Sequence, residues 1–182
     1  MIYPMSVMSD VRNALNGAIR LACLDRGGFD CFDRSETGFW KSFRAAALLY
    51  PVFLAMVLRA GWLAETEDYI RPLVIQSGTY VLTWLVFPVV MAPICDLLGR
   101  RERYIGFIVA YNWSQIPQYG FSLILLGLGT GIDSAIGTIP IFLYEGFIAS
   151  VALDIGWMRA AMIVLVDYIL GTGIDILAGQ LL

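Results

Sequence analysis

The chain contains no histidine among its 182 residues. Histidine is the usual general base near neutral pH and the most frequent metal ligand in proteins. Its absence argues against a Ser-His-Asp hydrolase, a zinc enzyme with histidine ligands and a histidine-ligated haem protein. The three cysteines, Cys23, Cys31 and Cys95, form no Cys-x-x-Cys pair. An odd number at this spacing favours free thiols over disulfides or a thiolate metal site, so we expect no cofactor and no metal.

Charged residues are also scarce. They make up 15% of the chain, against 59% apolar residues, and the mean hydropathy is +0.73. Soluble domains contain about a quarter charged residues, and a soluble fold of this length has too little interior for so much apolar surface. The sequence therefore predicts an integral membrane protein. The formal net charge of −3 argues against nucleic acid as a partner, since that requires a clustered basic surface.

Residues 1–37 are predicted to be a cytoplasmic amphipathic helix followed by a linker. Apolar residues recur at helical spacing from Val7 to Ala22, while Asn13, Asn16 and Arg20 fall on the other side. The segment lacks the charged start and cleavage site of a signal peptide. It is too polar to cross a bilayer and is suited to lie at the interface or to dock on a bundle.

Five apolar segments follow, each long enough for a bilayer crossing, which takes about 20 residues. They cover approximately Phe39–Trp62, Leu73–Leu98, Tyr104–Leu128, Ile132–Ile155 and Trp157–Leu182. The predicted fold class is therefore all-α: a polytopic membrane bundle of five transmembrane helices over residues 38–182, preceded by the N-terminal interfacial helix.

The basic residues predict the orientation. Ten of the twelve lie before or at the start of the first segment, or in or next to the loops after the second and fourth, and only Arg59 and Arg71 lie on the opposite side. Because cytoplasmic loops are enriched in Lys and Arg, we expect a cytoplasmic N-terminus and an outer C-terminus in a bacterial inner (plasma) membrane. The turn containing Arg100, Arg101 and Arg103 is a candidate contact for lipid headgroups.

Two acidic residues, Glu145 and Asp167, lie inside the predicted fourth and fifth segments. Each is about 11 residues from the turn near Gly156, which places both about 16 Å deep in an antiparallel pair. Three amide residues of the third segment complete the candidate cluster: Asn112, Gln115 and Gln118. The spacing of the two glutamines predicts that they share one helix face.

Three interpretations of this cluster are open. Polar side chains cross-link membrane helices, and the carboxyls would then share a proton as part of the helix packing. Alternatively the cluster holds a proton or a small cation, the usual role of ionisable residues at this depth. The third interpretation is a contact with a lipid or a quinone.

A six-residue sequence occurs twice on the predicted outer side, at positions 128–133 and 170–175. Its glycines and aspartates are Gly129, Gly131, Asp133, Gly171, Gly173 and Asp175. In the first copy we expect a helix-ending glycine, with Asp133 as the N-cap of the next helix. The second copy either breaks the last helix or allows close helix packing, and packing is the favoured interpretation.

The layout resembles the Yip1-domain superfamily of small five-span membrane proteins. The resemblance lies in the basic turn at 96–101, the segment Tyr104–Phe107, the proline-bearing segment Tyr111–Pro117 and the segment Leu143–Phe147. It implies a helical membrane module that acts through protein or lipid contacts and has no catalytic residues.

The function predicted from the sequence is that of a non-enzymatic scaffold or accessory subunit. It would contact membrane lipids and either a protein partner or further copies of itself, through small-residue faces such as Ala45–Ala47 and the repeat glycines. The alternative is a small proton- or cation-coupled transporter or channel that uses Glu145 and Asp167. An enzyme acting on lipids ranks last, because the sequence shows no set of acid, base and nucleophile.

Overall fold

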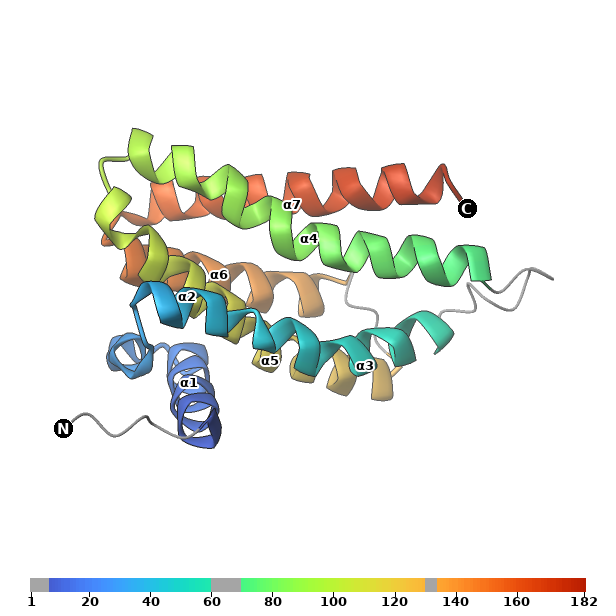
Figure 1. Cartoon of the computed structure of the whole chain (residues 1–182), viewed down its shortest axis with the longest axis horizontal. Helices are drawn as coiled ribbons and strands as arrows, with labels where there is room; N and C mark the ends of the chain where they lie inside the picture. The colour runs from blue at the N-terminus through green and yellow to red at the C-terminus, as the bar shows by residue number, and fades with distance from the viewer. Residues whose placement is uncertain (1–6, 60–69, 130–133) are drawn as a thin grey trace.

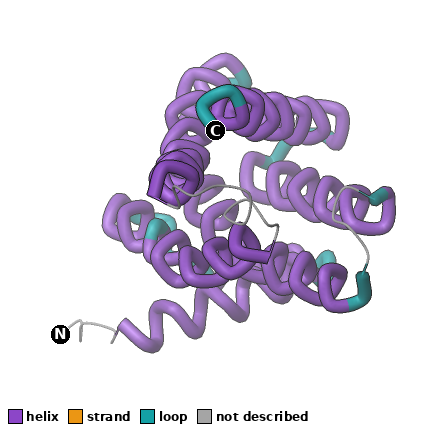
Figure 2. The backbone as a smooth tube through the Cα atoms, turned by 90° about the vertical axis from the view of Figure 1, so that its right-hand side faces the viewer, coloured by secondary structure: helices purple, strands orange, loops and turns teal. Residues whose placement is uncertain are grey.

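The computed structural model describes residues 7–59, 70–129 and 134–182. Within these ranges the chain is helical and contains no strand (Figure 2), which confirms the all-α class. In chain order, the elements are α1 (Val7–Ala22), the 3₁₀ turn η1 (Arg26–Cys31), α2 (Glu36–Ser42), α3 (Arg44–Arg59), α4 (Ile70–Leu97), the 3₁₀ turn η2 (Arg101–Arg103), α5 (Tyr104–Gly127), α6 (Ala135–Leu153) and α7 (Trp157–Gly179).

Four helical segments are long and apolar enough to cross a membrane: Glu36–Arg59, which joins α2 and α3, together with α4, α6 and α7. Figure 1 shows these helices running along the long axis of the molecule, with α5 beside them. The chain therefore has the character of a membrane-embedded protein. The predicted third span coincides with α5, but α5 is not among these four, because its polar side chains lower its hydropathy.

Helix α5 is the central helix of the bundle. It packs against α1, α2, α3, α4 and α6. Its polar residues Asn112, Ser114, Gln118 and Ser122 are buried inside the protein. Polar side chains are costly in contact with lipid tails, so the helix that carries most of them is the one that the others surround.

Helix α1 lies across the bundle rather than along it (Figures 1 and 2). Ala14, Ala18 and Leu21 form its buried face, which packs on α5 and α6. The hydroxyl of Tyr144 on α6 donates a hydrogen bond of 2.8 Å to the carbonyl oxygen of Ala18. The helix is thus docked on the bundle, and its location at a membrane interface stays a prediction.

The turn after α1 is closed by Asp25. This carboxylate accepts hydrogen bonds from Nε of Arg20 (2.7 Å) and from the backbone N–H of Gly27 (2.8 Å). The contact with the Arg20 guanidinium, followed by the Gly27 hydrogen bond, lowers the pKa of Asp25 below its usual value, because both stabilise the ionised carboxyl.

The two copies of the repeat have different structures. In the first, α5 ends just before Gly129, whose φ of +73° is that expected of a helix-ending glycine. The N-cap of α6 is Ser134, whose side chain accepts a hydrogen bond from the Gly137 N–H. The prediction that Asp133 is this N-cap is therefore wrong; Gly131 and Asp133 themselves lie outside the described residues.

In the second copy, α7 continues without a break to Gly179, so the alternative of a discontinuous helix is wrong. A Cβ atom added to Gly171 or Gly173 would meet no other atom within 4 Å. These glycines therefore make no close helix contact among the described residues of the chain. Gly171 lines a cavity between α3, α4, α5 and α7, whereas Gly173, two positions further along the helix, points in a different direction.

Candidate functional site

A tyrosine and a carboxylate connect helices α5 and α7. The hydroxyl of Tyr111 on α5 donates a hydrogen bond of 2.6 Å to Oδ2 of Asp167 on α7. Asp167 is half-buried, and its helix begins at Trp157 directly after the Gly156 turn. A phenol is a neutral donor, so the contact orients the carboxyl without neutralising a charge.

The second carboxyl comes from α6. Glu145 is half-buried and lies close enough to Asp167 for their charges to interact, with the side chain of Gln118 beside it. No ion pair in the part of the chain that the structure describes involves either carboxyl. The pair therefore has no basic partner there, and two negative charges at this position would repel each other in a medium of low dielectric constant.

The amide and hydroxyl of two further α5 residues are incompletely paired. Gln118 is 7% exposed and Ser114 fully buried. Although Gln118 lies next to Glu145, its Nε2 makes no hydrogen bond of acceptable geometry, and neither does Oγ of Ser114. Unpaired buried polar atoms are uncommon in native structures. The unpaired Nε2 of Gln118 leaves hydrogen-bonding capacity beside Glu145.

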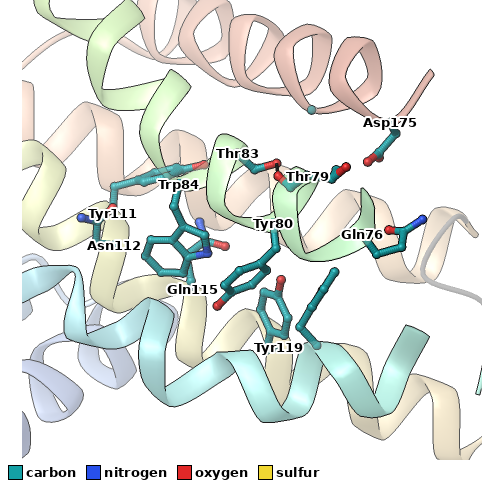
Figure 3. Close-up of a pocket in the computed structure, with 12 residues that line it drawn as sticks. Gln76, Thr79, Tyr80, Thr83, Trp84, Tyr111, Asn112, Gln115, Tyr119 and Asp175 are labelled. Carbon is teal, nitrogen blue, oxygen red and sulfur yellow. Dashed lines mark hydrogen bonds between the residues drawn. The ribbon is translucent and has the colours of Figure 1, made fainter. Parts of the chain in front are cut away.

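A cavity of about 350 Å³ lies on the other side of α5, between α3, α4, α5 and α7. Its polar and aromatic side chains are shown in Figure 3. Helix α4 contributes Gln76, Thr79, Tyr80, Thr83 and Trp84, and α5 contributes Tyr111, Asn112, Gln115 and Tyr119. The cavity thus offers many hydrogen-bonding groups inside a bundle whose outer surface is largely apolar.

Tyr111 joins this cavity to the carboxyl pair, because it lines the cavity and also donates to Asp167. Tyr111 and Asn112 lie at one end of the cavity, and Gln76 and Asp175 lie at the other (Figure 3). Asp175 is exposed and belongs to the last turns of α7. The arrangement is a row of polar groups that begins at the exposed carboxylate of Asp175 and ends at the half-buried carboxyl pair.

The structure brings together only part of the predicted cluster. Glu145, Asp167 and Gln118 are neighbours, whereas Gln115 lines the cavity and diverges from Gln118. Asn112 is 1% exposed, and its Nδ2 donates to Oγ of Ser42, so this amide connects helices. Tyr111 could not be assigned to the site from the sequence analysis above. The feature that could have indicated it is its position directly before the polar residues of α5, at the same expected depth as the two acids.

The arginines of the α4–α5 turn make contacts inside the protein. Arg100 donates to the carbonyl oxygen of Asp154 at 3.1 Å, Arg103 pairs with the Asp154 carboxylate at 3.5 Å, and Arg101 pairs with Asp96 at 3.2 Å. The two contacts with Asp154 connect the turn to the one between α6 and α7. Contact with lipid headgroups stays a prediction.

No protein-family model matches this chain, and no curated protein or solved structure matches it. The resemblance to the Yip1-domain superfamily therefore stays a prediction.

Proposed function

We propose that the protein crosses the inner membrane five times and carries protons in exchange for a small cation. The fifth crossing is α5, which lies among the four apolar segments and turns its polar residues inward. With the N-terminus in the cytoplasm, the arginines of the α4–α5 turn lie on the cytoplasmic side. Asp175 and Gln76 then mark the outer end of the cavity.

One observation supports this proposal most directly: Tyr111 belongs both to the polar cavity and to the hydrogen bond with Asp167. Two carboxyls that face each other without a basic partner need a positive charge nearby, either a proton or a cation. Occupancy by one disfavours the other. This competition is the chemical requirement for exchange.

The test uses purified protein in liposomes that contain a pH-sensitive dye. A gradient of a small cation, with inorganic and organic cations tested in turn, drives the exchange, and the dye reports the opposite flux of protons. We expect flux with the wild type and its loss in Glu145→Gln and in Asp167→Asn, with the folded yield retained. Asp30→Asn is the matched control, because its side chain is 77% exposed and remote from the pair. Wild-type flux in both test variants contradicts the proposal.

The scaffold function remains a second candidate, supported by the open position of Gly173 on α7. A Cβ atom added to Gly173 would meet no other atom within 4 Å, and small residues at open positions favour close helix association. If the protein acts as a scaffold, cross-linking in native membranes captures a stoichiometric partner or a second copy, and Gly173→Leu abolishes the capture. If cross-linking captures neither a partner nor a second copy with the wild type and with the Gly173→Leu variant, the scaffold function is contradicted.

A further inference from the structure

We propose that the cavity between α3, α4, α5 and α7 binds a small organic ammonium ion. The inference identifies the cation of the proposed exchange and rests on the proposed function for its role in transport. Binding itself is measurable without transport. Four properties of the lining side chains lead to this class of ligand.

The first property is the direction of the hydroxyl groups. Oγ1 of Thr79 donates to the carbonyl oxygen of Ile75 at 2.9 Å, and Oγ1 of Thr83 donates to that of Thr79 at 3.0 Å. Tyr111 donates its hydrogen to Asp167. The hydrogens of these hydroxyls are thus used within the protein, and their oxygens offer lone pairs to a ligand. Such a lining favours a ligand that carries positive charge or N–H donors.

The second property is the presentation of aromatic rings. The hydroxyl of Tyr80 donates to the carbonyl oxygen of Ala46 on α3 at 2.6 Å, so Tyr80 offers its ring to the cavity. Phe53 and Trp84 also line the cavity, with ring centroids 4.6 and 6.1 Å from that of Tyr80. The faces of such rings carry partial negative charge and attract ammonium groups.

The third property is charge. Asp175 lines the exposed end, and Asp167 lies behind Tyr111 at the buried end. No lysine or arginine is among the described residues that line the cavity. An anion would therefore meet the Asp175 carboxylate directly and the Asp167 carboxyl behind Tyr111, with no compensating cation, which disfavours an anion on electrostatic grounds.

The fourth property is size. A volume of about 350 Å³ falls within the usual range of small-molecule sites. A bare metal ion would leave most of it to water and would make no use of the rings. An organic ammonium fills the space and contacts the rings and the oxygens together.

Binding at the Tyr111 end also has a consequence for the carboxyl pair. A cation there repels a proton held between Glu145 and Asp167, since a low dielectric strengthens the interaction. The proton then leaves to solvent, and the ligand undergoes no chemical change. In weakly buffered detergent solution, binding is therefore accompanied by acidification.

Choline is the probe, and 3,3-dimethylbutan-1-ol is its neutral control of nearly the same shape. Equilibrium dialysis of labelled choline against the purified full chain measures affinity. We expect choline to bind, the alcohol not to compete at tenfold excess, and Asp175→Asn to weaken binding by about tenfold. Thr79→Val, which replaces an oxygen with a methyl group, is the second test variant, and Asp30→Asn is the control.

Competition by the alcohol, equal competition by potassium ion, or wild-type affinity in both test variants overturns the inference. Glu145→Gln separates it from the proposed function: choline still binds, but the acidification is lost. If the wild type binds choline but shows no proton flux, the proposed function is contradicted and the inference about binding stands. If proton flux depends on Glu145 but the protein does not bind choline, the inference is contradicted and the proposed function stands.

Discussion

The amide of Asn112 on α5 donates a hydrogen bond of 2.8 Å to the hydroxyl of Ser42 at the end of α2. Both side chains are buried, at 1% and 0% exposure, and they are 70 positions apart in the chain. The contact fixes the central helix against the segment that begins the first span. Removal of this contact therefore measures how much one polar contact contributes to the stability of the bundle.

We predict a coupling of about 0.6 kcal/mol between these residues, the average for hydrogen bonds between membrane helices. A double-mutant cycle of Asn112→Ala and Ser42→Ala, followed by unfolding in mixed micelles, measures it. Ser122→Ala is the control, because that hydroxyl donates only to Gln118 of its own helix and should show no coupling to Ser42. Additive effects of the first pair contradict the prediction.

Removal of the Tyr111 hydroxyl should reduce proton flux several-fold without lowering the folded yield. The substitution Tyr111→Phe keeps the ring, which stacks on Phe87 at a centroid distance of 4.1 Å, and removes the hydrogen bond to Asp167. The liposome assay measures the flux. Tyr168→Phe, an exposed position on the same helix as Asp167, should leave flux unchanged. A loss of equal size in both variants would assign the effect to general disturbance of α7.

Truncation of the buried face of α1 should release this helix from the bundle. Leu21 is fully buried, so Leu21→Ala should lower the free energy of unfolding by about 2–4 kcal/mol. Ile19 is 56% exposed, so Ile19→Ala should change the free energy of unfolding only slightly. Hydrogen exchange of the α1 amides in detergent gives the comparison, with faster exchange expected only in the Leu21 variant. Equal protection in the two variants would mean that this face does not hold α1.

The Arg20–Asp25 contact should resist acidification. Because the folded-state pKa of Asp25 is lowered, its stabilising effect is present above the unfolded-state pKa and is lost as the pH falls through the folded-state pKa. That loss therefore occurs below the ordinary value of 3.8. An NMR titration of the Asp25 carboxyl should show this, and Arg20→Gln should move the midpoint back toward 3.8. A midpoint at or above 3.8 in the wild type is the contrary result.

The proposed five crossings predict that the two termini lie on opposite sides of the membrane. An alkaline phosphatase fused to the C-terminus should then be active, and a fluorescent protein at the same position should be dark. The reverse pattern would give an even number of crossings and would remove α5 from the membrane.

The ends of several helices could be predicted from the sequence. The predicted starts at Tyr104 and Trp157 coincide with the observed starts of α5 and α7, because charged residues and glycine mark the preceding turns. The N-cap of α6 could not be predicted with the same certainty. Ser134 follows Asp133 directly, and both residue types favour this position.

For the candidate site, the sequence predicts only how deep its residues lie in the membrane. Counting residues from a turn gives the depth of Glu145 and Asp167, whereas the rotation of each helix about its axis depends on packing. For this reason the proximity of the acids, the divergence of Gln115 from Gln118 and the contribution of Tyr111 required the structure. The cavity also required it, since its lining comes from four helices.

The central position of α5 has a consequence for how the protein enters the membrane. Helices are admitted to the bilayer largely according to their own hydropathy, and α5 is not among the four segments that meet that criterion. If α5 is the fifth crossing, as we propose, its insertion depends on neighbours that shield its amides. Helix α6, which packs against it, is synthesised afterwards. The polar residues that form the site thus make the completion of the chain a condition for its stable assembly.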